Sequence, residues 1–497
     1  MEKINLSKST FLRGIQCPKS LYLYKNNFGL RDKLSATKEA IFSRGNSVGL
    51  LAHKLFPNGK DCSPPSSLKF LEGLAKTKDC INNSEALIYE ACFQAEGVYS
   101  ALDILEFKNQ EYTAYEVKSA SKISSIYIMD AALQYFVISR NGIQLKDFFL
   151  VYVDTSYVRE KKLDPERFFK KKSILRKVLE LQPYVEEKVA ELKRMLAEGV
   201  EPNLPIGEHC HSPYSCDFIG TCRGDLANDS IFFLNGASKQ LIYSLYNSGI
   251  KGISQLDDSF PFNSEQRIQF DSIKNATDFI DPSKIKAFVE SVSYPIYFLD
   301  FELFMPAIPL FEGTSPYQHI PFLYSVHKKM LPESELSHFS FLADWGYDPT
   351  EKFIESLLID LGEHGDILVF DATHEIRVLN KAAHLFPKFK PAIDKLLKRI
   401  KDLSMPFQQK YFYTKEMKGS YSMKTLLPII APELSFDDLK IKNGVSALTA
   451  FEHLATETDL FKLQETREAL IEYCKLDTYG LVKIFQLLEH LSKKNIE

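Results

Sequence analysis

The sequence has no run of about 20 apolar residues, and its first residues, MEKINLSKST, include no apolar leader. A helix needs about 20 predominantly apolar residues to cross a bilayer, so no membrane span and no membrane partner are expected. Only 8 of the 497 residues are cysteine, which is far too few for a secreted domain built on disulfides. These absences predict a protein of the reducing cytoplasm.

The sequence also lacks an excess of positive charge, because 61 Lys and Arg residues face 65 Asp and Glu residues. With a net charge of −4 there is no global basic field. Any contact with nucleic acid must therefore come from local patches such as residues 160–177, EKKLDPERFFKKKSILRK. That run is also typical of a solvated helix face. A chain of this length predicts two or three domains.

The most informative stretch is residues 99–119, YSALDILEFKNQEYTAYEVKS. It predicts a β-hairpin with strands at residues 99–107 and 111–118. A period of two places Glu116 and Lys118 on one face, and Asp103 can lie beside them across the ladder. Carboxylates that converge with a lysine suit hydrolysis assisted by Mg²⁺ or Mn²⁺. The alternative is an exposed sheet face with an ordinary ion pair.

This stretch resembles the D-x(n)-E-x-K signature of the PD-(D/E)XK nucleases. Residues 1–225 resemble the iron–sulfur branch that contains the AddB-type and CRISPR-adaptation RecB-like nucleases. The resemblance implies that Asp103, Glu116 and the Val117 carbonyl are metal ligands and that Lys118 is the catalytic lysine.

The same resemblance extends to two residues outside the hairpin. His53 follows an Arg44-Gly45 element and would join the metal site, whereas a partly buried helix histidine is the alternative. Gln134 lies on the helix predicted after the hairpin and would support the site. Ile138 stands where the family has a tyrosine on that helix.

Three cysteines follow one another at intervals of six residues in EHCHSPYSCDFIGTC, namely Cys210, Cys216 and Cys222. With Cys17 the set reaches four, and four thiolates can hold either Zn²⁺ or an iron–sulfur cluster. The resembled nucleases carry a [4Fe–4S] cluster with one cysteine before the core and three after it. The resemblance therefore implies a structural [4Fe–4S] cluster, with zinc as the alternative. The other cysteines are interpreted as ordinary thiols: Cys62, Cys80, Cys92 and Cys474.

The second half of the chain has a different set of acidic residues. Asp300 and Glu302 share one face of an apolar strand, SYPIYFLDFELF, where carboxylates are costly unless they are paired or bind a metal. Glu375 falls on the first turn of a helix that follows a strand beginning at residue 366. Tyr473 and Asp477 are four residues apart and share one face of a late amphipathic helix.

These residues resemble the site of the DnaQ-like, or DEDD, exonucleases in their tyrosine subclass. The resemblance implies that two metal ions bind to Asp300, Glu302, Glu375 and Asp477, with glutamate at position 375 where most such enzymes have aspartate. Tyr473 would orient the attacking water. The alternative is a ribonuclease-H-like domain that keeps its acids for folding only.

We therefore expect an α/β protein with a PD-(D/E)XK restriction-endonuclease-like domain at residues 1–225 and a ribonuclease-H-like, DnaQ-type domain at residues 286–497. Residues 226–285 are predicted as a helical linker, in which residues 245–256 resemble half of a helix-hairpin-helix element. This domain order resembles an uncharacterised bacterial family that fuses the two nuclease types.

The expected function is metal-dependent hydrolysis of nucleic acid. DNA is the expected substrate, as single strands or ends, in repair or antiviral defence. Two other classes of function stay open. One is a nucleic-acid-binding protein with inactive sites and a structural iron–sulfur cluster, and the other is an iron–sulfur redox sensor.

Overall fold

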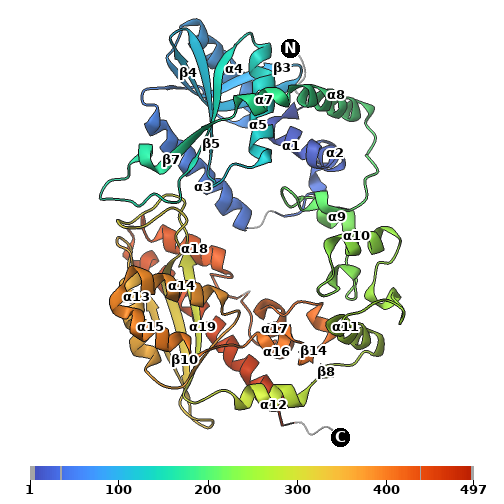
Figure 1. Cartoon of the computed structure of the whole chain (residues 1–497), viewed down its shortest axis with the longest axis vertical. Coiled ribbons are helices and arrows are strands. Elements are labelled where there is room, and N and C mark those ends of the chain that lie inside the picture. The colour runs from blue at the N-terminus through green and yellow to red at the C-terminus, as the bar shows by residue number, and fades with distance from the viewer. Residues whose placement is uncertain (1–5, 34–35, 437, 494–497) are drawn as a thin grey trace. The chain divides into compact units, whose positions relative to one another are not determined.

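The computed structural model describes residues 6–33, 36–436 and 438–493. The chain divides into two compact units (Figure 1). The first comprises residues 1–225 and 306–317, and the second comprises residues 226–305 and 318–497. Each unit contains a mixed β-sheet with helices packed on it, which confirms the α/β class. No helix in the described part of the chain is long and apolar enough to cross a membrane.

The described part of the first unit forms a seven-stranded sheet in which β1 (Leu6–Ser7) pairs with β4 off the main path. The main path is β2 (Lys60–Asp61), β3 (Leu87–Ala95), β4 (Val98–Lys108), β5 (Glu111–Lys118), β6 (Leu145–Val153) and β7 (Phe169–Ser173). The predicted hairpin is confirmed as β4 and β5, with Ile104 opposite Tyr115. Asn109 and Gln110 form its turn, both with a left-handed φ.

The helices of the first unit begin with α1 (Lys8–Gln16) and α2 (Pro18–Asn26), which are separated at Cys17. Cys17 has extended backbone angles, and Pro18 occupies the first turn of α2. The helix predicted after the hairpin is α5 (Ser125–Arg140), whose buried side chains pack in the main core of this unit. The other helices are α3 (Ala36–Ala52), α4 (Phe70–Asn82), α6 (Pro165–Phe168), α7 (Leu175–Glu180), α8 (Gln182–Glu198) and α9 (Ile219–Arg223).

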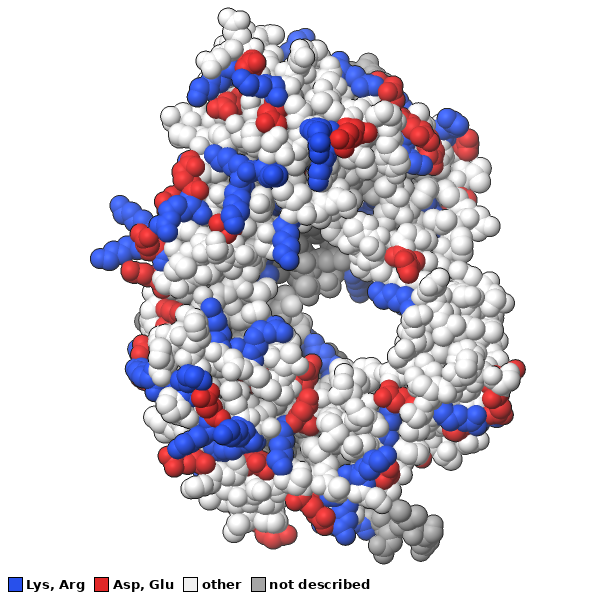
Figure 2. Space-filling model, in the orientation of Figure 1, with Lys and Arg blue, Asp and Glu red and all other residues white. Residues whose placement is uncertain are grey.

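The basic run at residues 160–177 does not form one solvated helix face, so that interpretation is wrong. It is divided among α6, β7 and the start of α7, and β7 is the last strand on the path of the sheet. The exposed side chains of Lys170, Lys171 and Lys172 lie on this edge strand, where lysines discourage pairing with another chain. On the face of the molecule in Figure 2, basic and acidic side chains are interspersed.

The described part of the second unit has a five-stranded sheet in the order β11-β10-β9-β12-β13. The first strand in sequence, β9 (Ile296–Phe304), lies in the middle. Its antiparallel side is β10 (Ile320–Lys329) and then β11 (Leu336–Leu342), and its parallel side is β12 (Asp366–Val369) and then β13 (Ile400–Asp402).

Helices cover both faces of this sheet. One face packs against α19 (Leu460–Leu491), as Phe298 and Phe485 share a hydrophobic core. The other face packs its alternate residues, such as Leu299, against α13 (Thr350–Leu361), α14 (Thr373–Leu385) and α15 (Lys390–Leu397). Two further helices, α17 (Met423–Ile430) and α18 (Gly444–His453), precede α19.

The predicted linker region belongs to the second unit. It contains α10 (Lys239–Asn247), α11 (Ser264–Asn275) and α12 (Pro282–Glu290), together with a small core around Ile253 and Phe270. A short strand, β8 (Phe279–Ile280), pairs with β14 (Phe412–Tyr413). The segment that resembles half of a helix-hairpin-helix element continues from the end of α10 into a 3-10 turn at Ile253–Gln255.

Candidate active sites

Three carboxylates converge in the second unit. One side-chain oxygen each from Asp300, Glu302 and Asp477 lies within 4.8 Å of the other two. Strand alternation directs Asp300 and Glu302 to the same face of β9, and α19 carries Asp477 across that face. The structure therefore brings together acids that are up to 177 positions apart in the sequence.

The electrostatic surroundings make this cluster costly to ionise. Burial among protein atoms raises the pKa of Asp300 to about 7. Burial and the charge of Asp300 raise the pKa of Glu302 to about 8, and the same two causes raise the pKa of Asp477 well above its usual range. A hydrogen bond from the Tyr473 hydroxyl and the charge of Lys424 oppose the pKa shifts of Glu302 and Asp477 without cancelling them.

Glu375 lies on the first turn of α14, as predicted, and is 5% exposed. Its Oε2 has no hydrogen-bond partner among the described residues. Burial and the charge of Asp300 raise its pKa to about 8. Glu375 is therefore an electrostatic neighbour of the cluster, although it is not part of the group within 4.8 Å.

Two residues of this site had been given no site role from the sequence. The Cys474 thiol, interpreted as an ordinary thiol, is fully buried with its Sγ 3.9 Å from Asp300 Oδ2. Gly444 begins α18, and a Cβ at this position would lie 3.3 Å from Glu302 Oε2. The position of Cys474 between Tyr473 and Asp477 in the sequence could have indicated that it lies at this site. Nothing in the sequence around Gly444 indicates that it does.

The hairpin residues of the first unit also meet. Lys118 Nζ donates to Glu116 Oε1 over 2.6 Å. Asp103 Oδ2 accepts the backbone N–H of Val117 over 2.6 Å, which holds that carboxylate beside the E-x-K strand. Glu116 is 1% exposed, so this pair is an internal ion pair and not the exposed one considered above.

Two charged residues that the sequence had not indicated complete this group. Lys8, the first residue of α1, donates to Glu116 Oε1 over 2.8 Å and lies 3.8 Å from Asp130 Oδ2. Asp130 on α5 also accepts from Lys118 over 2.5 Å. No local pattern predicts the contact between Lys8 and Glu116, which are 108 positions apart.

The pKa values of Glu116 and Asp103 shift in opposite directions, because the two lysines contact Glu116 directly. Burial alone would raise the pKa of Glu116, but Lys118 and Lys8 lower it to about 2. Burial and the charge of Glu116 raise the pKa of Asp103 to about 8. Three buried groups keep polar atoms without a partner among the described residues: Glu116 Oε2, Asp130 Oδ1 and both amide atoms of Gln134. Such atoms fit a site that receives a cation and its water.

Glu90 and His53 differ in their relation to this group, because the charges of Lys8 and Glu116 affect Glu90 alone. Glu90 has a left-handed φ of 51° within β3, between Tyr89 and Ala91, which pair with Ile104 and Leu102 of β4, and burial raises its pKa. A non-glycine residue in this conformation within a strand is strained. The ring of His53 stacks on Tyr89 with centroids 3.9 Å apart, and burial lowers its pKa. No contact in the described part of the chain joins His53 to Asp103 or Glu116, so its metal role stays a prediction.

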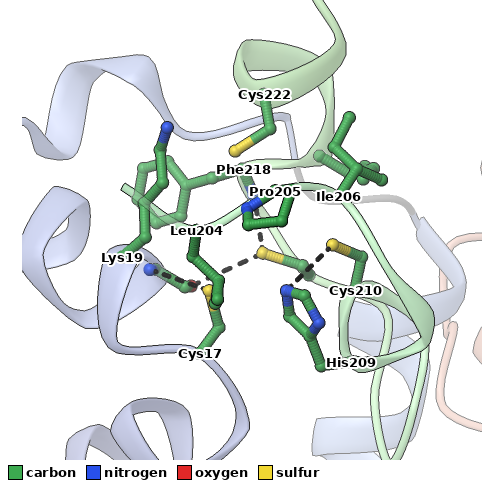
Figure 3. Close-up of a pocket in the computed structure, with 12 residues that line it drawn as sticks. Cys17, Lys19, Leu204, Pro205, Ile206, His209, Cys210, Phe218 and Cys222 are labelled. Carbon is green, nitrogen blue, oxygen red and sulfur yellow. Dashed lines mark hydrogen bonds between the residues drawn. The ribbon is translucent and has the colours of Figure 1, made fainter. Parts of the chain in front are cut away.

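The four predicted cluster cysteines line one pocket (Figure 3). Cys17 Sγ accepts the backbone N–H of Ser20 over 3.3 Å, and Cys216 Sγ lies 3.5 Å from the Ser20 hydroxyl. Burial raises the pKa of the Cys17 thiol to about 11, and repulsion from the other thiolates contributes to the shift. Burial likewise raises the pKa of Cys210 and Cys222. Thiols in this setting ionise readily only with a cation among them.

Comparison with known proteins identifies one matching family. Residues 297–422 match a domain of unknown function, DUF2779. The matched region begins in β9 and includes Asp300, Glu302 and Glu375, and it ends before Tyr473 and Asp477. No curated protein and no solved structure matches the chain.

Proposed function

We propose that this protein is a metal-dependent nuclease that hydrolyses phosphodiester bonds of nucleic acid, with DNA as the expected substrate. The observation that carries the proposal is the convergence of Asp300, Glu302 and Asp477. Carboxylate oxygens are the ligands that Mg²⁺ and Mn²⁺ prefer. The raised pKa values of all three acids further support a site that a divalent cation completes.

The topology of each unit supports the two nuclease types. The second sheet has its first strand, β9, in the middle. Antiparallel pairing joins β10 to β9 and β11 to β10 on one side, and parallel pairing joins β12 to β9 and β13 to β12 on the other, which agrees with a ribonuclease-H-like domain of the DnaQ type. In the first unit, the hairpin of β4 and β5 is followed by α5 and by β6, which is parallel to β5. This order agrees with a PD-(D/E)XK domain.

In the second unit the chain's own residues have separable roles. A bound divalent ion would supply Lewis acidity to the phosphoryl group and would lower the pKa of a bound water. The Tyr473 hydroxyl reaches Glu302 and Asp477 and can orient that water. Glu375 offers a further carboxylate, and Lys424 can meet a phosphate oxygen.

In the first unit Lys118 stays protonated, because Glu116 and Asp130 raise its pKa against the effect of burial. It can therefore donate to a phosphate oxygen that gains charge during cleavage. Glu116 Oε2 and the Asp103 carboxylate remain to bind a cation.

The cysteine pocket supports a metal group held by four thiols, because Cys17, Cys210, Cys216 and Cys222 all line it. Four thiolates can hold either zinc or an iron–sulfur cluster. The proposed group is the [4Fe–4S] cluster that the resemblance implies, and zinc is the alternative.

Iron analysis tests this cofactor. Anaerobically purified protein should contain about four iron atoms per chain. Cys216→Ala should lose the iron, and Cys62→Ala should retain it, because Cys62 is a buried thiol of the same unit outside the pocket. Stoichiometric zinc without iron would show that the zinc alternative is correct.

Cleavage of 5′- and 3′-labelled single- and double-stranded DNA and RNA tests the function. Wild type, Lys118→Ala, Asp300→Asn and the double variant should be compared with Mg²⁺, with Mn²⁺ and with a chelator. Each single variant should keep the activity of the other site, and the double variant and the chelated protein should have none. Cleavage that survives in the double variant would contradict the proposal.

The same experiment separates the two alternative functions. Tight binding without metal-dependent cleavage would indicate a nucleic-acid-binding protein with inactive sites. Binding that changes when the cluster is oxidised, again without cleavage, would indicate a redox sensor.

A further inference from the structure

Helix α1 connects the acidic group of the first unit to the cysteine pocket. It begins at Lys8, whose Nζ is 2.8 Å from Glu116 Oε1, and it ends at Gln16, immediately before Cys17. An α-helix of nine residues is about 13 Å long. One short, rigid element therefore has its first side chain in the acidic group and its last residue beside the cysteines.

The end of α1 near the pocket is held by residues 208–222, which carry three of the four cysteines and form the cysteine segment. Gln16 Nε2 donates to the backbone carbonyl of His209 over 2.7 Å and to that of Tyr214 over 2.6 Å. Arg13 donates to Asp217, the residue after Cys216, over 2.9 Å. The position of α1 along its axis therefore depends on this segment.

At the other end of α1, Lys8 determines how Glu116 presents its oxygens. Lys8 and Lys118 both donate to Oε1, and Oε2 keeps no partner among the described residues. A cation at Oε2 would be close to the Lys8 ammonium and would be repelled by it. The two-residue strand β1, which pairs with β4, is the other anchor of this end.

We propose that Lys8 is a positioning residue of the first acidic site, and that the cysteine segment controls the cation affinity of this site through α1. With the segment in place, Lys8 fixes the orientation of Glu116 and limits how tightly the cation binds. When the segment is released, Lys8 withdraws and the cation binds more tightly to a less ordered carboxylate. This inference rests on the proposed function of the site.

Binding of Mn²⁺ to the full chain tests the inference, with the second site disabled by Asp300→Asn and Asp477→Asn. In this background Lys8→Met should tighten Mn²⁺ binding about tenfold, because one repelling charge is removed. Lys8→Arg should keep the parent affinity. Gln16→Ala leaves every thiol intact and should tighten binding about threefold. The double variant Lys8→Met/Gln16→Ala should match Lys8→Met, because Gln16 acts through Lys8.

Gln182→Ala is the matched control. The Gln182 amide also donates to two backbone carbonyls, those of Ala132 and Val178, and neither belongs to α1 or to the cysteine segment. This variant should leave Mn²⁺ affinity unchanged even where it lowers the melting temperature.

Three results would overturn the inference. An unchanged affinity in Lys8→Met would remove Lys8 from the site. An unchanged affinity in Gln16→Ala, or effects that multiply in the double variant, would remove the connection through α1. Mn²⁺ binding that does not depend on Asp103, tested with Asp103→Asn, would instead overturn the proposed site itself.

Discussion

The two acidic sites of the molecule differ in how positive charge balances their clustered carboxylates. In the first unit, Lys8 and Lys118 bind Glu116 directly and lower its pKa to about 2. In the second unit, no ion pair with Asp300, Glu302 or Asp477 is found among the described residues, and burial raises the pKa of each. The first site therefore carries much of its counter-charge within the chain, whereas the second depends on an added cation.

The largest effect expected from this difference is on stability as a function of pH. The pKa of Asp300 is 3.8 in an unfolded chain and about 7 in the fold. Because the folded state holds this proton more tightly, the stabilisation is complete below about pH 4 and is lost as the pH rises to about 7. In metal-free protein Asp300 should contribute about 4 kcal/mol to the loss of stability of the second unit over this window. Hydrogen exchange of β9 amides with a chelator present measures the loss.

Glu116 in the first unit should affect stability in the opposite direction as the pH changes. Its pKa is lowered from 4.5 to about 2, so its stabilisation is present above about pH 4.5 and is lost as the pH falls toward 2.

Two changes test the high-pH loss of stability in the second unit. Saturating Mg²⁺ should remove this loss, and Asp300→Asn should make the stability of the second unit less dependent on pH. An equal high-pH loss in Asp300→Asn/Asp477→Asn would assign the effect to other groups.

The next effect is on the rate of cleavage and not on metal binding. Tyr473→Phe should slow stepwise shortening of a 5′-labelled strand by about 100-fold, because the hydroxyl orients the water. Its Mn²⁺ affinity should stay unchanged, whereas Asp300→Asn should lose both binding and rate. Tyr479→Phe is the control, since Tyr479 lies on another face of α19 and packs against His327. A loss of Mn²⁺ binding in Tyr473→Phe would make the tyrosine a part of the metal site.

A smaller effect is expected at Glu375. Glu375→Gln removes a buried carboxylate with an unpartnered oxygen, so metal-free protein at pH 8 should gain about 1–2 kcal/mol of stability. The same change should weaken the stabilisation by Mg²⁺, measured as the shift in melting temperature. Glu433→Gln, at an exposed glutamate near Lys483, is the control. A Mg²⁺ shift equal to that of wild type would leave Glu375 outside the metal site.

Local patterns predicted the elements that need only neighbours in sequence. The hairpin and the shared face of Asp300 and Glu302 both follow from the alternation of side chains along a strand. The contact of Lys8 with Glu116 could not be predicted, because it depends on how α1 packs against the sheet. The run at residues 160–177 was misinterpreted because its charges fit a helix face, while pairing with β6 makes its centre a strand.

The smallest effect expected is at Gln134, which separates packing from support of the first site. Gln134 is fully buried on α5, one turn after Asp130, and neither of its amide atoms has a partner among the described residues. Gln134→Leu should therefore raise stability by about 1 kcal/mol, because an unsatisfied amide is replaced by an apolar group of similar size. Cleavage by the first site should nevertheless fall several-fold, measured in the Asp300→Asn background, if the amide holds water beside Asp130. Gln182→Leu, which breaks two hydrogen bonds of a comparable amide, should instead lower stability. A Gln134→Leu protein that is more stable and equally active would mean that the amide only fills the core. Lys8 and Asp130 would then support the first site without Gln134.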